Sequence, residues 1–300
     1  MNLNFKPVEA EDMSRLRPFY GLRPNRTCDS VFLDSFLWKD YYKVECAVSE
    51  DKAVLWLMEK DGILSSAMPL CKEEDLPHFF YQMVDYFDNV LHKPFYISLA
   101  DAEAVEYLDL DPEKFEVTEL DDLKDYLYDG NAMRTLAGKK KNRLNGFLKT
   151  YEGRYEYRRI CCSDRQEVWQ FMEKWRQQKV ESYENEISLD YEVAGIHDIL
   201  KNCSAFNVPM AGVYIDGELK AFTVGSLNER ENMAVIHIEK ADPEINGLYQ
   251  FINQQFLVHE FPDVALVNRE DDVGMPGLRK AKMSYYPVDF ARKYSVKKKY

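Results

Sequence analysis

The order of apolar segments in the second half of the chain constrains the fold more than any other feature of the sequence. Two runs of strand length flank the hairpin turn Asp216-Gly217, and a third follows at residues 233–238. The remaining segments are a helical pattern at 245–260, a short apolar run at 264–267, a helix at 278–286 and a strand at 288–296. Antiparallel strands mixed with helices in this order predict an α/β (α+β) fold, with a mostly antiparallel sheet flanked by helices.

The first half shows a weaker version of the same order, and a reversal of charge separates it from the second. Between residues 99 and 129 there are 12 acidic side chains and 2 basic ones, whereas between 134 and 159 there are 9 basic and 2 acidic. An Asp-Gly-Asn turn signal lies at the reversal. The sequence therefore predicts two tandem domains, 1–129 and 130–300, the second carrying a basic linker helix at 134–149.

Composition excludes several classes of protein. In 300 residues, 46% hydrophobic and 14% aromatic side chains are too many for a disordered chain, and no apolar run approaches the roughly 20 residues of a membrane span. The six cysteines form no C-x-x-C pair, so we expect buried, reduced thiols in a cytoplasmic protein without a metal site. A net charge of −13 disfavours general nucleic-acid coating but allows a local basic groove. Walker, G-x-S-x-G and G-x-G-x-x-G motifs are all missing from the sequence.

Three segments carry a resemblance to a known family. They are LAGKKKNRLNGFLK at 136–149, HIEKADPEINGLYQFIN at 237–253 and VNREDDVGMPGLRKAKMSYYP at 267–287. Together with the order of elements, they resemble the C-terminal domain of phosphatidylglycerol lysyltransferases, whose doubled arrangement is similar to tandem GNAT-fold and Fem-type aminoacyl-tRNA-dependent transferases. The resemblance implies two GNAT-like domains and transfer of an acyl or aminoacyl group from an activated carrier to an amine or hydroxyl of a small or lipid acceptor.

The donor is either an aminoacyl-tRNA or an acyl-CoA. In acyl-CoA-dependent GNAT enzymes, a glycine-rich loop before the central helix holds the pyrophosphate with its backbone N–H groups. Here the loop contains Asp242 and Glu244, which repel a pyrophosphate, and of the glycines it keeps only Gly247. We therefore favour aminoacyl-tRNA as the donor and tRNA as a partner, with acyl-CoA as the alternative.

We expect catalysis where neighbouring central strands separate, around Glu239. Two residues apart on one strand, His237 and Glu239 should share a face, and Glu239 is a candidate general base. Glu270 follows the next strand, in a run of polar residues that interrupts the apolar pattern. By the resemblance, Tyr285 is a candidate acid for the leaving group. The catalytic candidates are thus Glu239, Glu270 and Tyr285.

The binding candidates are polar and basic residues around the same position. Three successive acids are suited to an ammonium group, and an arginine fork to a phosphate or carboxylate. The basic helix is suited to an electrostatic track for tRNA or an anionic lipid head. These binding candidates are His237, Asn268, Arg269, Asp271, Arg279, Lys282, Lys139, Lys140, Lys141 and Arg143.

Each candidate also has a purely structural interpretation. Glu239 can pair with a nearby cation, Tyr285 can pack with its hydroxyl at the rim, and the basic helix can balance the acidic segment before it. A protein that kept the fold and lost the chemistry would be a binding module. The transferase hypothesis depends on a wedge between strands at position 239, with the polar cluster near 270 facing it.

Overall fold

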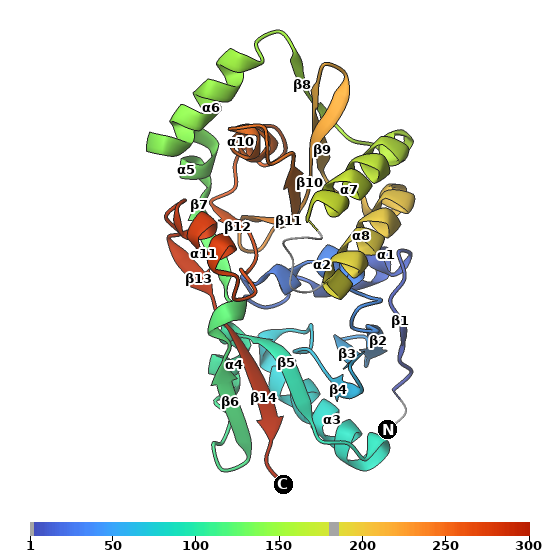
Figure 1. Ribbon diagram of the computed structural model, residues 1–300. Helices are drawn as coiled ribbons and strands as arrows, with labels where there is room; N and C mark the ends of the chain where they lie inside the picture. The colour runs from blue at the N-terminus through green and yellow to red at the C-terminus, as the bar shows by residue number, and fades with distance from the viewer. Residues whose placement is uncertain (1–2, 180–185) are drawn as a thin grey trace.

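The computed structural model describes residues 3–179 and 186–300, whose strands form three sheets of four, seven and three strands (Figure 1). The seven-stranded sheet has the order β13-β7-β12-β11-β10-β9-β8. Its strands are β7 (Asp125–Asp129), β8 (Tyr155–Arg159), β9 (Met210–Ile215), β10 (Glu218–Asn228), β11 (Met233–Ala241), β12 (Leu266–Asn268) and β13 (Asp289–Ala291). All neighbours in it are antiparallel except β11 and β12. The mixed α/β architecture expected from the sequence is confirmed.

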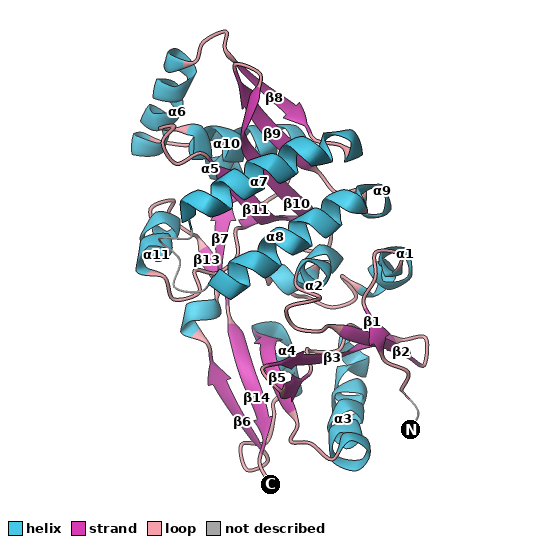
Figure 2. Ribbon diagram, turned by 45° about the vertical axis from the view of Figure 1, so that its right-hand side comes forward, coloured by secondary structure: helices cyan, strands magenta, loops and turns pink. Residues whose placement is uncertain are grey.

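Helices cover both faces of this sheet. On one face lie α5 (Gly130–Thr135), α6 (Gly138–Thr150) and α10 (Leu248–Glu260), and on the other lie α2 (Phe32–Leu37), α7 (Arg165–Lys179) and α8 (Glu186–Lys201) (Figures 1 and 2). The central strands β9, β10 and β11 are therefore almost entirely buried. Strands buried on both faces have near-continuous apolar sequences, which explains the long apolar runs in the second half.

The first half of the chain forms the two smaller sheets. The four-stranded sheet has the order β1-β2-β3-β4, and the three-stranded sheet has the order β5-β14-β6. Their strands are β1 (Lys6–Pro7), β2 (Glu45–Ser49), β3 (Ala53–Lys60), β4 (Ile63–Ser65), β5 (Tyr96–Asp101), β6 (Phe115–Glu119) and β14 (Lys293–Lys298). The other helices are α1 (Asp12–Leu16), α3 (Leu76–Tyr86), α4 (Ala102–Leu108), α9 (Cys203–Phe206) and α11 (Pro276–Met283).

The two halves exchange strands. β7, from the end of the first half, pairs with β12 and β13 in the seven-stranded sheet, while β14, at the end of the chain, lies between β5 and β6 (Figure 1). The single strand expected at residues 288–296 is therefore wrong, because the segment forms two strands in two different sheets. Each half, as divided at the expected boundary 129/130, therefore contributes one strand to a sheet of the other half.

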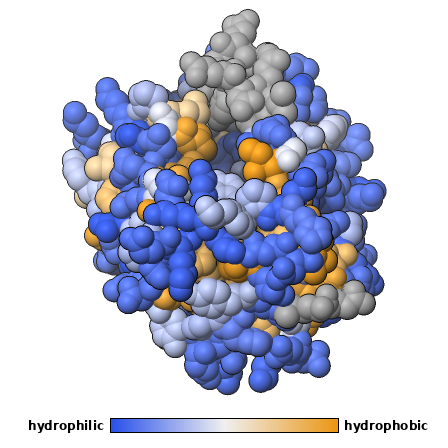
Figure 3. Space-filling model, turned by 90° about the horizontal axis from the view of Figure 1, so that it is seen from below, coloured by the Kyte–Doolittle hydropathy of each residue, from blue (hydrophilic) through white to orange (hydrophobic). Residues whose placement is uncertain are grey.

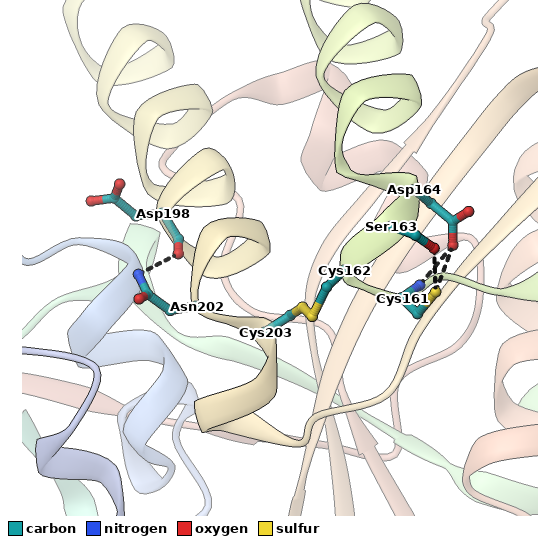
Figure 4. The surroundings of a disulfide bond; sticks show 7 residues. All are labelled: Cys161, Cys162, Ser163, Asp164, Asp198, Asn202 and Cys203. Carbon is teal, nitrogen blue, oxygen red and sulfur yellow. Dashed lines mark hydrogen bonds between the residues drawn. A yellow bond between two sulfur atoms is a disulfide. The ribbon is translucent and has the colours of Figure 1, made fainter.

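The cysteines differ in part from expectation. Cys28, Cys46 and Cys71 are buried free thiols, as expected. Cys161 is exposed, and Cys162 is bonded to Cys203, which corrects the expectation of six buried, reduced thiols. Figure 4 shows this disulfide joining the segment before α7 to the segment after α8. It therefore fixes the two helices to one another at one end.

The face of the molecule seen from below is mainly hydrophilic (Figure 3). It shows small apolar patches separated by polar side chains. Among the described residues, no helix combines the length and the hydropathy that crossing a bilayer requires.

The exchanged strand β14 predicts a measurable dependence of stability on its buried side chain. Val296 is fully buried between β5 and β6, and its cross-strand neighbour Val117 is 37% exposed. We expect Val296→Ala to lower the free energy of unfolding by about 2 kcal/mol, because it leaves a cavity in the core of the first half. Val117→Ala is the matched control and should cost less than half as much in urea denaturation. Equal losses would show that β14 does not anchor this core.

Candidate active site

The candidate site begins where two central strands separate. β11 and β12 are parallel and paired at three positions, ending at Val235 with Asn268. β11 continues for six residues to Ala241, whereas β12 ends at Asn268. Beyond this point the two strands no longer pair, because β12 ends, and the Arg269 side chain bonds to Glu239 of β11. The wedge between strands at position 239 stays a prediction.

A β-bulge at His237 sets the directions of the side chains along β11. In the pairing with β10, Ile236 lies opposite Gly225 and Ile238 opposite Val224, so His237 is the extra residue. The expectation that His237 and Glu239 share a face is therefore wrong. His237 contacts Ser226 and Glu270, on the side of α2, whereas Glu239 contacts α10.

On the α10 side, Glu239 holds an arginine. Its carboxylate accepts hydrogen bonds from Arg269 Nη2 at 2.7 Å and from Asn253 Nδ2 at 2.6 Å. Because both oxygens of this 9% exposed side chain have donors, Glu239 is arranged to orient Arg269. The structural interpretation of Glu239, pairing with a cation, is thus realised. Asn253 Oδ1, in contrast, is buried without a hydrogen-bond partner among the described residues.

The Arg269 guanidinium lies against an aromatic side chain that was a catalytic candidate. Arg269 Cζ is 4.8 Å from the centre of the Tyr285 ring. The Tyr285 hydroxyl accepts a hydrogen bond from Gln250 Nε2 at 3.0 Å, which leaves its own proton free to be donated. Burial raises the pKa of Tyr285, so that proton stays on the phenol at neutral pH.

Cations from the basic helix complete this side. Lys140 Nζ lies 3.8 Å from the centre of the Tyr285 ring and donates to Ser284 Oγ at 2.6 Å. Among the described residues, no acidic side chain forms an ion pair with Lys140. Burial, Arg143 and Arg269 lower the pKa of Lys140 to about 8. Lys139 and Arg143 are exposed on α6, and Lys141 donates to the carbonyl oxygen of Thr135. Of the expected basic track, Lys140 lies nearest to the site.

On the α2 side, the second catalytic candidate, Glu270, pairs with a histidine. Glu270 Oε1 lies 3.2 Å from His237 Nδ1, and His237 Nε2 lies 3.0 Å from Ser226 Oγ. His237 is fully buried, whereas the Glu270 side chain is 23% exposed. Glu270 itself has a left-handed backbone, with φ of 58°, and its side chain lies on the α2 side, whereas that of Arg269 lies on the α10 side.

Residues of the first half approach Glu270 from the same side. Cys28 Sγ and carboxylate oxygens of Asp34 and Glu270 all lie within 4.8 Å of one another. Asp34 belongs to α2 and is 8% exposed. Burial, Asp29 and Glu270 raise the pKa of the Asp34 carboxyl well above its usual range. The first half therefore contributes directly to the surroundings of the site.

A buried ion pair lies behind this cluster. Lys293 Nζ donates to Asp125 Oδ1 at 2.8 Å and lies 3.2 Å from Cys28 Sγ and 3.7 Å from an Asp271 carboxylate oxygen. Asp125 is completely buried and also accepts from the backbone N–H of Cys28. Burial raises the pKa of Asp271 to about 6. Asp271 is thus positioned beside an internal cation.

Three of the expected binding residues bond to the protein itself. Asn268 is buried and donates to Asp125 Oδ2 and to the Arg26 carbonyl oxygen. Arg279 pairs with Asp272 and Asp122. Lys282 Nζ donates to the backbone carbonyls of residues 269–271. These side chains hold the loop after β12 in place, and the loop in turn positions Arg269 and Glu270.

Sequence reasoning missed the contributions of Asn253, Cys28, Asp34, Asp125 and Lys293. Asp34 had a local signal, because a carboxyl within the apolar helical segment VFLDSFL is out of place on a buried face. Lys293 and Asp125 had none, because their burial results from the strand exchange. Their proximity is a property of the three-dimensional arrangement of the sheets.

This arrangement defines the class of fold: a tandem GNAT protein from the clavulanic acid biosynthesis pathway shares it at 11% identity and a TM-score of 0.50, over 99% and 98% of the two chains. A family model described as phosphatidylglycerol lysyltransferase, C-terminal, matches residues 21–297. The chain belongs to this family of aminoacyl transferases.

Two solved structures and one curated protein show the relationship. A conserved protein of unknown function from Bacteroides thetaiotaomicron VPI-5482 is 27% identical with a TM-score of 0.88, covering 99% of this chain and 100% of that one. L-PGS from Bacillus licheniformis shares the fold, at 16% identity and a TM-score of 0.69, over 97% and 93% of the two chains. An uncharacterized protein of Mycoplasmoides gallisepticum is 28% identical over 177 residues, 57% of this chain. The match spans 55%, about half, of that relative's length.

The Glu239–Arg269 pair predicts strong energetic coupling. Both side chains are largely buried, with 9% and 14% of their surfaces exposed. In a double-mutant cycle with Glu239→Gln and Arg269→Gln, we expect a coupling energy of roughly 2 kcal/mol in urea unfolding. The exposed pair Arg154–Asp216 is the matched control, for which about 0–1 kcal/mol is expected. Coupling no larger than in the control would contradict the orienting role of Glu239.

Proposed function

We propose that this protein transfers an aminoacyl group from aminoacyl-tRNA to an amine or hydroxyl of a small or lipid acceptor. The reaction would take place where β11 and β12 part. The cytoplasm, where charged tRNA is found, would be its location. The new bond joins the aminoacyl carbonyl carbon to the acceptor nitrogen or oxygen, and the ester bond to the terminal ribose of tRNA breaks.

The cation cluster on the α10 side carries this proposal. Lys140 and Arg143 have no acidic partner within 4 Å among the described residues, although the chain has a net charge of −13. Arg269 lies near Lys140, and among the described residues Glu239 is its one acidic partner within 4 Å. Unpaired cations beside a buried arginine are suited to the phosphates at the end of a tRNA.

The loop before α10 supports tRNA over acyl-CoA as the donor. Two of its backbone N–H groups already have partners: Glu244 donates to the Asp242 side chain, and Ile245 to the Asp242 carbonyl. Gly247 packs so closely against α6 that a Cβ there would lie 2.3 Å from the Arg143 carbonyl oxygen. The position at which a pyrophosphate would meet a helix N-terminus is thus covered by α6.

The side chains on the two sides of the sheet are suited to the two halves of the transfer. Glu270, held by His237 and partly exposed, is positioned to take the proton of the acceptor nucleophile. Tyr285 is positioned to give a proton to the leaving ribose oxygen, and Arg269 to stabilise the negative charge that develops on the carbonyl oxygen. Glu239 and Asn253 orient Arg269.

This assignment predicts the effect of removing the base. Glu270→Gln should lower kcat for aminoacyl transfer about 10²- to 10⁴-fold, because the amide cannot accept the proton. The measurement uses purified protein, a mixture of charged tRNAs, and amine and phosphatidylglycerol acceptors, with products identified by mass spectrometry. Asp216→Asn, at an exposed turn, is the control and should retain full activity.

Two outcomes would overturn the proposal. Turnover of acyl-CoA without turnover of charged tRNA would make the protein a conventional acyltransferase. Absence of turnover with every donor, together with unchanged ligand binding in Glu270→Gln, would make it a binding module.

The lowered pKa of Lys140 predicts a pH dependence of tRNA binding. Its pKa is lowered to about 8, so the ammonium is present below this value and lost as the pH rises through it. We expect tRNA affinity to fall between pH 7 and pH 9 at constant ionic strength, measured by filter binding. Lys140→Arg should flatten this profile, because arginine stays protonated. Lys149→Arg, elsewhere on α6, should behave as the native protein, and an unchanged profile in Lys140→Arg would exclude Lys140 from the tRNA site.

A further inference from the structure

Three cysteines near the start of α7 differ in exposure and bonding. Cys162 is exposed and is bonded to Cys203, which is 6% exposed. Cys161, its neighbour in sequence, is an exposed free thiol. The Cys161 Sγ donates to Asp164 Oδ2 at 3.2 Å, and Figure 4 shows it turned to Ser163 and Asp164, on the side away from Cys203. The disulfide therefore has one exposed half and one buried half, and the adjacent thiol takes no part in it.

The exposed half makes this disulfide open to exchange with thiols in solution. Exchange requires a thiolate to reach one of the two sulfurs, and exposed disulfides are the labile ones. Cys162 can be reached from solvent, whereas Cys203 belongs to the apolar core that also contains Leu200 and Phe206. An incoming thiolate therefore attacks Cys162, and Cys203 is the leaving group.

The buried half of the disulfide is connected to α2 by close packing. Cys203 is the first residue of α9, and Phe206 is its last. The Phe206 ring centre lies 4.6 Å from that of Phe36 and 6.2 Å from that of Phe32, and both of these residues belong to α2. Because packed interiors contain little free space, a displacement of α9 is transmitted to α2.

α2 is also the element that the first half of the chain contributes beside the proposed base. A carboxylate oxygen of Asp34, on α2, lies within 4.8 Å of one of Glu270. α8, which precedes α9, packs on the same helix: a Cβ at Gly195 would lie 2.2 Å from the Leu37 carbonyl oxygen. Opening the disulfide removes the covalent restraint on α9 and lets α2 shift relative to Glu270.

We infer that Cys162 is a modification site for low-molecular-weight thiols, and that its bond to Cys203 opens and closes reversibly and thereby sets the position of α2. The inference goes beyond the proposed function, on which only its activity measurement rests. It gives the first half of the chain a regulatory link to the second, because α2 belongs to the first half and the disulfide to the second.

The exchange proceeds in two steps. The thiolate of a small molecule bonds to Cys162 Sγ, the bond to Cys203 breaks, and Cys203 Sγ keeps the electron pair and takes a proton from solvent. A second small thiolate then attacks the sulfur of the first, which releases Cys162 as a thiolate and forms the disulfide of the small molecule. Two small thiols are thus oxidised, and the two protein sulfurs gain two electrons. In the reverse direction, Cys203 displaces the small thiol from Cys162 and closes the bond.

The first test equilibrates the full chain with glutathione at varied ratios of its thiol to its disulfide form. After acid quenching and alkylation in denaturant, mass spectrometry reports the state of each cysteine. We expect Cys162 and Cys203 to become alkylated together and reversibly as the ratio rises, with glutathione attached to Cys162 in between. Cys161→Ser is the control, in which this pair should titrate as in the native protein. A bond that stays closed at every ratio, two free thiols at every ratio, or glutathione attached to Cys203 would each overturn the inference.

The second test measures the response of α2 without any substrate. Cys28 lies within 4.8 Å of Asp34 and Glu270, whereas Cys71 is buried in the separate core of the first half. With the disulfide open, we expect N-ethylmaleimide to modify Cys28 of the folded protein about threefold faster or more, and Cys71 at an unchanged rate. Cys162→Ala should show the faster rate at every glutathione ratio. Equal Cys28 rates in both redox states, or equal acceleration at Cys71, would contradict a link between the disulfide and α2.

Activity separates this inference from the proposed function. Opening the disulfide should lower kcat for aminoacyl transfer about twofold or more in the native protein and in Cys161→Ser, because the surroundings of Glu270 change. Cys162→Ala should have the lower activity in both redox states. Equal kcat of the native protein in both states would overturn the regulatory role of the disulfide. Absence of transfer in both states, with the two cysteine measurements as expected, would instead overturn the proposed function and leave the modification site standing.

Discussion

The buried ion pair between Lys293 and Asp125 holds the parts of this molecule together. Lys293 begins β14 in the three-stranded sheet, and Asp125 begins β7 in the seven-stranded sheet. Asp125 also accepts hydrogen bonds from the Cys28 backbone and from Asn268, so one carboxylate joins four segments that are distant in sequence. Removing one partner of such a pair typically costs about 3–5 kcal/mol, because the other charge stays buried. This buried pair lies where the two exchanged strands, β7 and β14, begin.

The position of the candidate site follows from this junction. Asn268, held by Asp125, is the last residue of β12, and β11 continues alone beyond it. The loop that follows is fixed by Lys282, which donates to three of its carbonyls, and by the Arg279–Asp272 pair. Because this loop is held in place, Arg269 and Glu270 are ordered before a substrate binds, so binding loses less conformational entropy. Preorganisation here comes from residues that the sequence suggested as ligands.

Local sequence patterns predicted the elements well and the long-range pairings poorly. The strands from residue 210 to 241 and the helix after them were predictable because alternation and helical periodicity are local properties. The division of residues 288–296 into two strands was not predictable, because β13 and β14 follow one another closely in sequence but belong to different sheets. Similarly, nothing in the sequence around His237 marks the bulge, which is defined by the pairing with β10. The candidates Arg269 and Glu270 were proposed because polar residues interrupt an apolar pattern, and Tyr285 because of the family resemblance, whereas Lys293 was hidden in a cationic tail.

The separation of charge across the sheet argues that the site is kept for ligands. Among the described residues, Lys140 and Arg143 on one side have no acidic side chain within 4 Å, and Asp34 on the other has no ion pair. The bulge at His237 directs His237 and Glu239 to opposite faces, each with its own partner. Local violations of the rule that buried charges are paired concentrate at functional sites. Cations without acidic partners on the α10 side fit the anionic tRNA of the proposed transfer, whereas a purely structural helix would gain from acidic partners at these positions.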